Sequence, residues 1–474
     1  MEHSIQQIIV EYVKKAVGMI QETGISNIGD FAEQLHTLCK SMTVTIVREV
    51  LRQMDTALVE ANRERKVDSL RIKERDVPRT LITSLGELHY ERTYFESGNG
   101  KRYYLLDHLI GVEPHERVSR DLCAMLVQAA AEVSMEKAAK QVGVPVSRQT
   151  VNNHVFRLRE VVVDAEPATT PPRELHLFAD EDHVHMKNGR NAMVPLVTIT
   201  EGIDTSKKRH KTINPVHFEG YGMDNQDFFE GISSFLYNRY DMERVENVYV
   251  HSDAGKWIET ARDWLPNVRF VMDGFHLQKR LRQVSRLPGA AARMSAIRKA
   301  LREDDLPCFL SQCKSIGENL SAPDRDKLNE HLCFIQNHWD AIVLRLQGSI
   351  CGSCTEPMVS HVLSKRLSRN PLAWSEQGLR QMAMLRVYVK NGGVVTANDI
   401  CAPKSCSRLP SKSRSLHPGY EKYRKLADNQ ISDFLSTKLD WSIFSQPPSS
   451  TGKLDAVGIL KKAYAAKRDF LASA

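Results

Sequence analysis

The chain has 474 residues and a mass of 53.8 kDa, and its 65 Lys and Arg against 58 Asp and Glu give a net charge of +7. This length predicts two to four domains, and 42% hydrophobic residues exclude a wholly disordered chain. No apolar run reaches the ~18 residues of a membrane span. Charged side chains at Glu2, Glu11, Lys14 and Lys15 argue against a signal peptide. We therefore expect a cytoplasmic protein that contacts no membrane, with a polyanion as partner.

The region 1–77 is predicted to be helical. Apolar side chains such as Ile8, Tyr12 and Val13 recur at helical spacing, and residues 42–59 repeat the pattern. The charged end of the region, NRERKVDSLRIKER, is interpreted as a solvated helical face. After Pro78 the apolar period changes to two, and a turn at Leu85-Gly86 predicts a β hairpin.

The rest of region 78–163 contains a helix-turn-helix pattern, SMEKAAKQVGVPVSRQTVNNHVFRLRE. A first helix over 135–141, a turn at Gly143 and a second helix capped by Ser147 fit its spacing. The second helix would present side chains that read bases or bind phosphates. These candidate DNA-binding residues are Arg148, Gln149, Asn152, Asn153 and Arg157. A plain helical scaffold of the same composition is the alternative.

An α/β domain follows the proline-rich stretch 164–174, which is interpreted as a linker. Across 174–284, three β-prone runs precede an alternation of helices and short apolar strands. This order is the layout of a ribonuclease H-like domain with a mixed sheet. Region 285–350 is predicted to be an all-helical insertion, 351–400 to complete the domain, and 401–474 to combine a flexible basic segment with C-terminal helices.

Two aspartates mark the ends of neighbouring strands in this domain. Asp180 lies near the end of the first strand, and Asp253 ends the fourth. The first and fourth strands of such a sheet are adjacent, so the two carboxylates should converge and repel each other unless a divalent cation binds. Oxygen ligands favour Mg²⁺ or Mn²⁺, and two such ions catalyse phosphoryl transfer. Asp182 could replace Asp180, because residues two apart share a strand face.

A third acid is expected to complete the metal site. Glu356 follows the helical insertion and opens a helix, whereas Glu376 in WSEQG is the rival. The helix of Glu356 carries three cations that could bind the DNA backbone, Lys365, Arg366 and Arg369. The alternative interpretation of Asp180 and Asp253 is that each is a helix N-cap or a surface carboxylate.

Seven motifs, in this order, give the chain a resemblance to a known family. They are TSLGELHYERTYF, YYLLDHLIG, ADEDHVHM, HSDAGKWI, DGFHLQKRL, EPMVSHVLSKRLSRNPLAWSEQG and LRVYVKNG. With them the chain resembles the ISLre family of bacterial insertion-sequence transposases, relatives of the Mutator-like DDE transposases. The resemblance implies a DDE triad at Asp180, Asp253 and Glu356, and an all-helical insertion between the second and third acids. It also implies that Asp273 and His276 form an Asp-x-x-His motif, and Pro357 departs from the small residue expected after the third acid.

We therefore expect an Mg²⁺-dependent (or Mn²⁺-dependent) transposase associated with the bacterial nucleoid. It would bind terminal inverted repeats, cleave them and join the ends to target DNA, as a dimer or larger homo-oligomer. Three further cationic groups, His276, Lys279 and Arg280, are expected to contact this DNA. The alternative is a catalytically inactive or repurposed DNA-binding relative.

Two further patterns leave alternatives open. The pairs Cys351/Cys354 and Cys401/Cys406 could bind zinc, although their spacing is atypical, and buried thiols are the simpler interpretation. Trp374 could stack on an unpaired base, but a core position is the more usual place for a tryptophan in such a segment.

Overall fold

The computed structural model describes most of the chain up to residue 401. The described residues are 5–23, 27–65, 70–97, 100–162, 166–169, 172–206, 210–318, 320–347, 350, 352, 354–369 and 372–401. The predicted basic tail and C-terminal helices, Cys351, Cys406 and part of the proline-rich stretch lie outside them. The described residues form two compact units, one within 1–125, 142–146 and 400–401 and the other within 126–141 and 147–399. The expected boundary at 164–174 thus lies inside the second unit.

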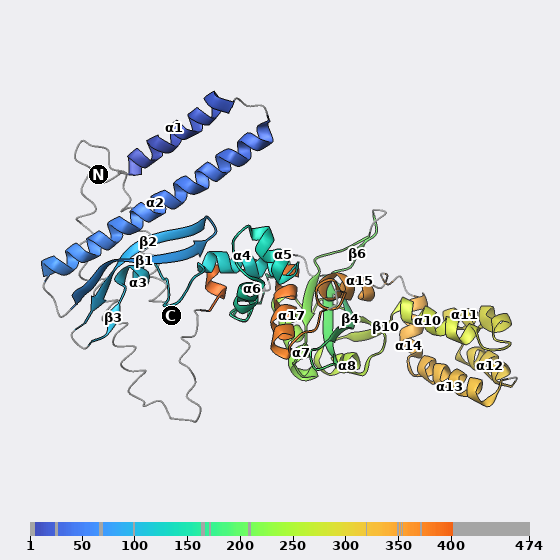
Figure 1. The fold of residues 1–474 in the computed structure, drawn as a ribbon. Helices are drawn as coiled ribbons and strands as arrows, with labels where there is room; N and C mark the ends of the chain where they lie inside the picture. The colour runs from blue at the N-terminus through green and yellow to red at the C-terminus, as the bar shows by residue number, and fades with distance from the viewer. Residues whose placement is uncertain are drawn as a thin grey trace. The chain divides into compact units, whose positions relative to one another are not determined.

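The first unit pairs a helical hairpin with a small antiparallel sheet (Figure 1). Its elements are α1 (Ile5–Thr23), α2 (Ile28–Arg65), β1 (Arg71–Thr83), β2 (Gly86–Glu96), β3 (Arg102–Tyr103) and α3 (Leu105–Leu109). Apolar side chains of α2, Leu51 and Leu58 among them, pack against Leu88 and Phe95 of β2. No helix in the described part of the chain is long and apolar enough to cross a membrane.

The predicted hairpin is present, but its first strand begins earlier than the sequence indicates. The charge pattern favours a helical face for the segment from Arg71, and this segment is strand β1 instead. Its charged side chains find partners on β2, such as the 3.4 Å pair between Lys73 and Glu96. Pro78 fits because β1 is an edge strand of the order β1-β2-β3. Cross-strand pairing therefore outweighs the helical propensity of the charged residues.

Three helices lead into the second unit. They are α4 (Arg120–Ala130), α5 (Met135–Val142) and α6 (Arg148–Val155). As predicted, the Ser147 side chain caps α6 by accepting a hydrogen bond from the Thr150 N–H (3.1 Å), and Gly143 has a positive φ of 74° between the two helices.

A mixed five-stranded sheet of order β10-β9-β4-β5-β8 forms the centre of the second unit. The strands are β4 (Glu174–His185), β5 (Asn191–Thr200), β8 (Val216–Glu219), β9 (Asn247–Ser252) and β10 (Val268–Met272). β4 pairs antiparallel with β5 and parallel with β9, so the predicted order of strands and helices is confirmed. A two-stranded ribbon, β6 (Ile203–Asp204) and β7 (Lys211–Thr212), adds a feature that the sequence did not predict.

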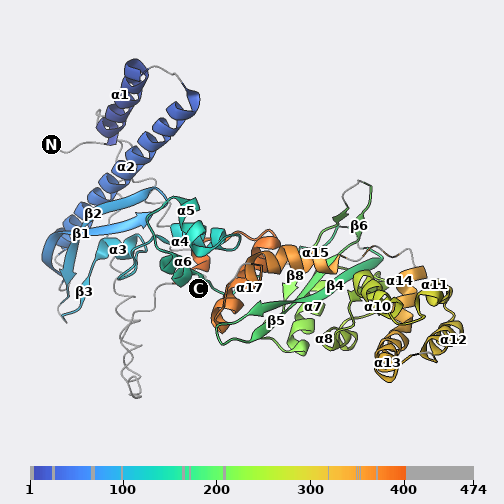
Figure 2. The same cartoon turned by 45° about the vertical axis from the view of Figure 1, so that its right-hand side comes forward.

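Helices cover both faces of this sheet (Figure 2). They are α7 (Asn225–Arg239), α8 (Lys256–Glu259), α9 (Ala261–Trp264), α15 (Thr355–Val359), α16 (Lys365–Leu367) and α17 (Glu376–Lys390). Phe228, Phe229 and Ile232 of α7 pack on Leu177 and Val250 of the sheet. On the opposite face, α15 lies against β4 and α17 against β8. Alternation along each strand therefore decides which side chains face α7 and which face α15.

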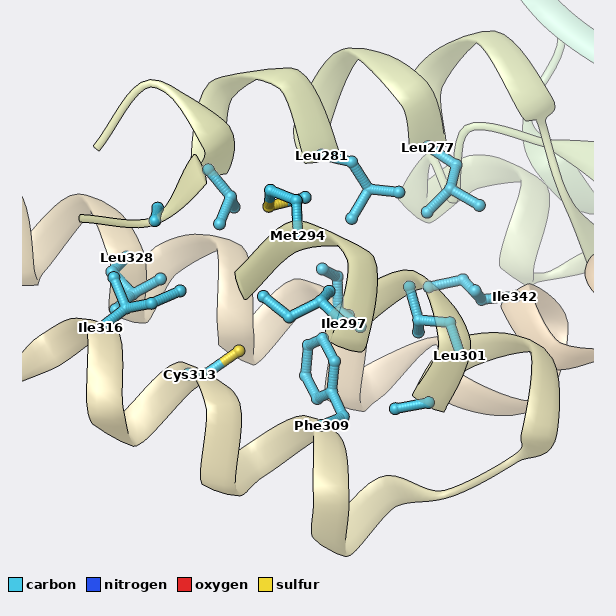
Figure 3. Close-up of a cluster of buried hydrophobic side chains, with 14 of the residues drawn as sticks. Leu277, Leu281, Met294, Ile297, Leu301, Phe309, Cys313, Ile316, Leu328 and Ile342 are labelled. Atoms are coloured by element: carbon cyan, nitrogen blue, oxygen red, sulfur yellow. The ribbon is translucent and has the colours of Figure 1, made fainter. Parts of the chain in front are cut away.

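The segment between β10 and α15 is a helical body with its own core (Figure 3). It contains α10 (Gly274–Ser285), α11 (Met294–Glu303), α12 (Leu306–Gly317), α13 (Ala322–Asn337) and α14 (Trp339–Gln347). Leu281, Ile297, Leu301, Phe309 and Ile342 are buried in this core. No strand occurs among its described residues, as the predicted all-helical insertion requires.

Candidate functional site

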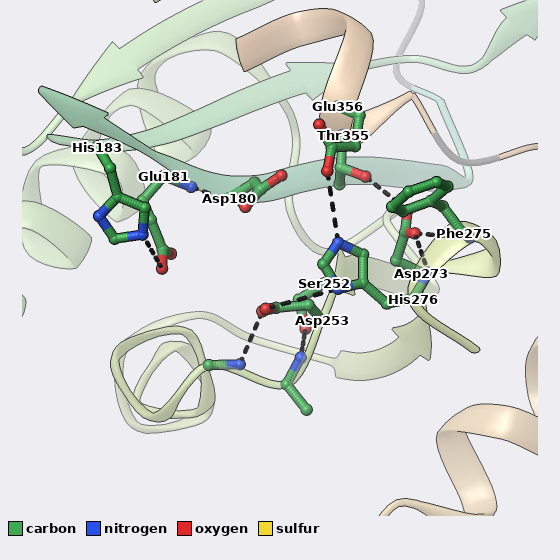
Figure 4. A network of polar contacts seen from close by, with 12 residues as sticks. Asp180, Glu181, His183, Ser252, Asp253, Asp273, Phe275, His276, Thr355 and Glu356 are labelled. Atoms are coloured by element: carbon green, nitrogen blue, oxygen red, sulfur yellow. Dashed lines mark hydrogen bonds and ion pairs between the residues drawn. The ribbon is translucent and has the colours of Figure 1, made fainter. Parts of the chain in front are cut away.

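Strand register brings the first two acids together. β4 and β9 run parallel, and Phe178 lies opposite His251. Two residues further along are Asp180 and Asp253, on the same face as Phe178 and His251 because strand side chains alternate. Asp253 follows the end of β9 as predicted, whereas Asp180 lies in the middle of β4 and not near its end, because β4 continues to His185 in its pairing with β5. Leu177 and Ala179 point to the other face, into the core beneath α7. The two carboxylates therefore project toward the side on which α15 lies (Figure 4).

A histidine connects the second acid to the third. His276 Nδ1 lies 3.9 Å from Asp253 Oδ2, and His276 Nε2 lies 3.5 Å from Glu356 Oε1. His276 is in the first turn of α10, directly after β10, whereas Glu356 is in the first turn of α15. The helical body thus leaves and rejoins the sheet at one place, although its two ends are about 80 residues apart in sequence.

Asp273 holds the two helix starts in register. Its side chain is 2% exposed, and its Oδ1 accepts hydrogen bonds from the backbone N–H groups of Phe275 (2.8 Å) and His276 (3.1 Å). Its other oxygen accepts from the Thr355 hydroxyl, one residue before Glu356. The Asp-x-x-His pair therefore serves two purposes here: Asp273 caps α10 and ties it to α15, and His276 contacts both neighbouring acids.

Backbone strain is stored beside Asp253. Ala254 has a φ of +69°, a conformation that costs an L residue about 1 kcal/mol. It is held by hydrogen bonds from the Ala254 N–H to Ser252 Oγ (3.1 Å) and from the Gly255 N–H to Asp253 Oδ1 (3.0 Å). The sharp turn fixes the direction of the Asp253 carboxylate.

Burial raises the pKa of Asp180 to about 7, and the negative charges of Asp253, Glu356 and Glu181 add to this effect. The charges of Asp253 and Glu356 thus reach Asp180, and His276 contacts both of them, so the structure brings the three predicted acids into one neighbourhood. Among the described residues, no three acidic, imidazole or thiol groups lie close enough to enclose a metal ion as they stand, and His276 lies between two of the acids.

The alternative acids have other partners. Asp182 is 7% exposed and accepts a hydrogen bond from Ser368 Oγ (2.9 Å). Glu376 lies in the exposed first turn of α17, and its charge acts on Tyr221 rather than on Asp180. Pro357 is in the first turn of α15, where its ring is tolerated, so the departure from the expected small residue leaves Glu356 in place.

A π-helical segment follows the third acid, and a buried arginine accounts for it. Residues Ser360–Ser364 form the π turn between α15 and α16. Arg386 of α17 is fully buried and donates to the backbone carbonyls of His361 (2.9 Å) and Val362 (2.6 Å). Such a turn changes which carbonyls the helix itself can satisfy, and the guanidinium supplies donors instead. No pattern in the sequence indicates this role.

Arg366, one of the predicted DNA contacts, does not lie on the surface. It is 4% exposed, and its Nε donates to the Ala130 carbonyl at 2.9 Å. Burial, with the neighbouring Arg386, lowers the pKa of Arg366 to about 10. We therefore remove it from the DNA contacts, because its position on the helix turns it inward, whereas Lys365 and Arg369 are exposed.

Trp374 is also used within the protein. Its Nε1 donates to the Leu367 carbonyl (2.9 Å), and the Arg366 guanidinium lies 5.1 Å from its ring centre. These contacts favour the core interpretation of Trp374 over the base-stacking one.

A basic cavity of about 720 Å³ begins at His276 and runs between α10 and α13. Its cationic lining comprises Lys279, Arg280 and Arg286 from α10 and the residue after it, and Lys327 from α13. Asp324 and Glu330 are its acids, and Asp324 pairs with Lys327 at 3.2 Å. Arg280 also stacks on Phe334, with 3.5 Å from the guanidinium carbon to the ring centre. The cavity is therefore a cationic surface next to the acids.

Four of the predicted helix-turn-helix residues lie on α6, and the fifth, Arg157, follows the end of that helix at Val155. Arg148, Gln149 and Asn153 are exposed, whereas Asn152 and Arg157 are partly buried. Gln149 Nε2 donates to Asn153 Oδ1 (2.8 Å), and Arg157 Nη1 lies 3.2 Å from the His154 ring.

The chain belongs to the UPF0236 family, because the model described as "Uncharacterised protein family (UPF0236)" matches residues 22–402. A UPF0236 protein of Caldanaerobacter subterraneus subsp. tengcongensis is 31% identical to this chain, and the alignment covers 81% of this chain and 83% of the relative's length. Another UPF0236 protein from that organism has a name that joins eleven numbered loci. It is 32% identical, over 77% of this chain and 79% of the relative's length. A Streptococcus gallolyticus relative named for the vanSb 3′ region is 23% identical over 79% and 86%.

We expect replacement of Asp180 by Asn to stabilise the protein at neutral pH. A carboxyl whose pKa is raised on folding contributes stability below its unfolded pKa and loses it as pH rises through the folded value, here from about 4 to about 7. At pH 8 in EDTA the variant should be more stable by about 2 kcal/mol. Urea unfolding of both proteins at pH 5 and pH 8 measures this difference.

Glu219, whose pKa burial also raises to about 7, titrates in the same range. The pH dependence of the free energy of unfolding of the wild-type protein therefore contains contributions from both Asp180 and Glu219. Only the difference in this free energy between the wild-type protein and Asp180→Asn isolates the contribution of Asp180. A difference that does not change between the two pH values would contradict the prediction.

Proposed function

We propose that this protein is a DDE transposase of a bacterial insertion sequence, built on a ribonuclease H-like domain. One observation carries the proposal: Asp180, Asp253 and Glu356 come from three distant segments and gather on one face of a five-stranded sheet, where His276 contacts Asp253 and Glu356 and the charges of both raise the pKa of Asp180. A sheet whose first strand is central, with its second and third strands on one side and two parallel strands on the other, supports the ribonuclease H-like assignment.

The acids fit a divalent cation by their chemistry. They offer only oxygen ligands, and a cation would relieve the repulsion that helps to keep Asp180 protonated near neutral pH. We therefore propose that Asp180, Asp253 and Glu356 hold Mg²⁺ or Mn²⁺. When bound, such ions supply charge stabilisation and activation of the attacking oxygen in phosphoryl transfer. In this scheme Asp273 positions Glu356 through Thr355, and His276 leaves its contacts with the acids to face the phosphate.

DNA would be held by the surfaces next to this centre. The cationic cavity lined by Lys279, Arg280 and Arg286 begins at His276, so a strand whose phosphate lies at the acids could continue along it. Lys365 and Arg369, which are exposed and follow Glu356 in sequence, would add further cations. We assign reading of the terminal repeats to the α5–α6 helix-turn-helix, through Arg148, Gln149 and Asn153 with Asn152 and Arg157 behind them.

Copy number in a relative's genome supports mobility. One relative's name joins eleven loci of a single organism, the pattern expected of an element that moves to new sites. Joining two element ends requires two active sites or more, so we further propose a homo-oligomer, at least a dimer on DNA. An inactive DNA-binding relative is the second candidate, and DNA cleavage separates the two.

The test is cleavage of DNA that flanks the coding sequence. We expect the full-length protein to bind duplexes that end in the inverted repeats and to nick them in Mg²⁺, with no nicking in EDTA. Asp263→Asn, which alters an exposed acid on α9, should cleave like wild type. Binding without nicking in any divalent cation would identify the inactive relative instead, and failure to bind any flanking duplex would overturn the proposal.

A further inference from the structure

A second cavity opens directly at the third acid. It has a volume of about 510 Å³ and lies between the start of α10, the end of α14 and the start of α15. Glu356, Thr355 and Asp273 contribute to its wall, so it adjoins the proposed phosphoryl-transfer centre. Its other lining residues include Phe275, Leu277, Arg345, Leu346 and Pro357. The cavity therefore has a mixed wall, in which apolar side chains stand beside one cation, the hydroxyl of Thr355, the amide of Gln278 and the carboxylates of Asp273 and Glu356.

Phe275 is the unusual member of this lining. Its side chain is 58% exposed, and no other phenylalanine or tryptophan in the described part of the chain is classed as exposed. A single exposed apolar side chain needs no explanation by itself, but this one lines the cavity that Glu356 also lines. It is labelled beside His276 and Asp273 in Figure 4.

Phe275 lies beside the imidazole that contacts two of the acids. Its backbone N–H donates to Asp273 Oδ1 (2.8 Å), and its ring lies edge-on to that of His276, with the ring centres 5.4 Å apart. His276 in turn contacts Asp253 and Glu356. Gly274 contributes as well, because a Cβ at this position would lie 3.3 Å from the Arg345 guanidinium. Successive residues of the DGFH motif thus have different tasks. The aspartate caps α10, the glycine leaves room for the Arg345 guanidinium, and the next two residues present an aromatic ring and an imidazole.

We infer that Phe275 is a stacking platform for a nucleobase that leaves the duplex next to the cleaved phosphate. This inference rests on the proposed function, which places a DNA phosphate at the acids. A nucleobase one position away would meet the exposed ring, and every base has a π face that stacks on an aromatic side chain. Leu277, Leu346 and Pro357 offer apolar surface to the planar base, and Arg345 suits the negative charge of its flanking phosphate.

Stacking would assist the reaction by offsetting the cost of unpairing. Extruding a base from a duplex costs a few kcal/mol, and an aromatic platform returns about 1–3 kcal/mol per base. The Asp273 side chain accepts hydrogen bonds from the Phe275 backbone and from Thr355, the residue before Glu356, so an extruded base and the phosphate would be positioned together. Trp374, the aromatic residue that the sequence offered for this role, is bonded to Leu367 instead.

The test compares Phe275→Ala and Phe275→Trp in the full-length protein. On a fully paired element-end duplex in Mg²⁺, Phe275→Ala should cleave ~10- to 100-fold more slowly than wild type, and Phe275→Trp should retain most activity. A mismatch at the base beside the cleavage site should restore part of the rate to Phe275→Ala. Tyr237→Ala, which removes a similarly exposed ring from α7, is the matched control and should not differ from wild type.

A second readout follows the base itself. With 2-aminopurine beside the cleavage site and the inactive Asp253→Asn protein, we expect the fluorescence change on binding to differ between Phe275 and Phe275→Ala. Equal cleavage and equal fluorescence in Phe275→Ala and Tyr237→Ala would overturn the Phe275 assignment while leaving the transposase proposal intact. So would a lower melting temperature with unchanged cleavage, because the ring would then pack on the chain itself. A wild-type protein that binds no DNA would overturn both.

Discussion

Replacement of Asp253 by Asn is expected to reduce DNA cleavage by at least about 10³-fold while leaving DNA binding unchanged. Asparagine keeps the oxygen that accepts the Gly255 N–H, so the strained turn at Ala254 should persist. It removes the negative charge on which cation binding and phosphoryl transfer would depend. The variant therefore separates chemistry from folding and binding.

Cleavage rates and DNA affinities of the wild-type, Asp253→Asn and Asp263→Asn proteins measure this separation. Asp253→Asn should match the wild-type protein in DNA affinity and in melting temperature. Asp263→Asn should match it in cleavage rate, DNA affinity and melting temperature. Cleavage by Asp253→Asn at the wild-type rate would remove Asp253 from the proposed centre.

Replacement of Arg386 by Met is expected to destabilise the protein strongly, by about 3–5 kcal/mol. The fully buried guanidinium donates to the carbonyls of Ala131 (3.1 Å), His361 and Val362 and pairs with Glu132 (2.6 Å). Methionine would fill much of the volume but leave these buried acceptors without a donor. The π turn after Glu356 should loosen as well, so cleavage should fall together with stability.

The control for Arg386 is Lys390→Met. Lys390 pairs with the same Glu132 carboxylate at 2.9 Å, but its side chain is 30% exposed, so its loss should cost less than about 1 kcal/mol. Urea unfolding of the two variants measures the contrast. Equal stabilities of Arg386→Met and Lys390→Met would show that the buried hydrogen bonds contribute nothing beyond an ordinary ion pair.

The second unit was largely predictable because its pattern is local. Short apolar strands, each followed by a polar residue, indicate the order of elements, and the alternation of side chains then places Asp180 and Asp253 on one face. The local pattern does not identify the third acid, since Glu356 and Glu376 are both plausible in sequence. Only the way in which the helical body rejoins the sheet at Thr355 brings Glu356, and not Glu376, to His276.

Burial of charge was not predictable. Arg366 and Arg369 lie three positions apart in one basic run, yet Arg366 is buried beneath the Ala130 carbonyl and Arg369 is exposed. The partners of a buried arginine are distant carbonyls, which leave no trace in the sequence around it. The segment that begins at Arg71 also depends on a distant partner. Its charge pattern fits a helix, but pairing with β2 makes it strand β1.

Binding of Mn²⁺, followed by electron paramagnetic resonance, tests most directly whether the three acids form one metal centre. The titration needs no knowledge of the DNA sequence. We predict that the wild-type protein binds Mn²⁺ at pH 8 and that Asp180→Asn, Asp253→Asn and Glu356→Gln each weaken binding at least about tenfold, whereas Asp263→Asn does not. Equal Mn²⁺ binding by the wild-type protein and the three variants would contradict the account.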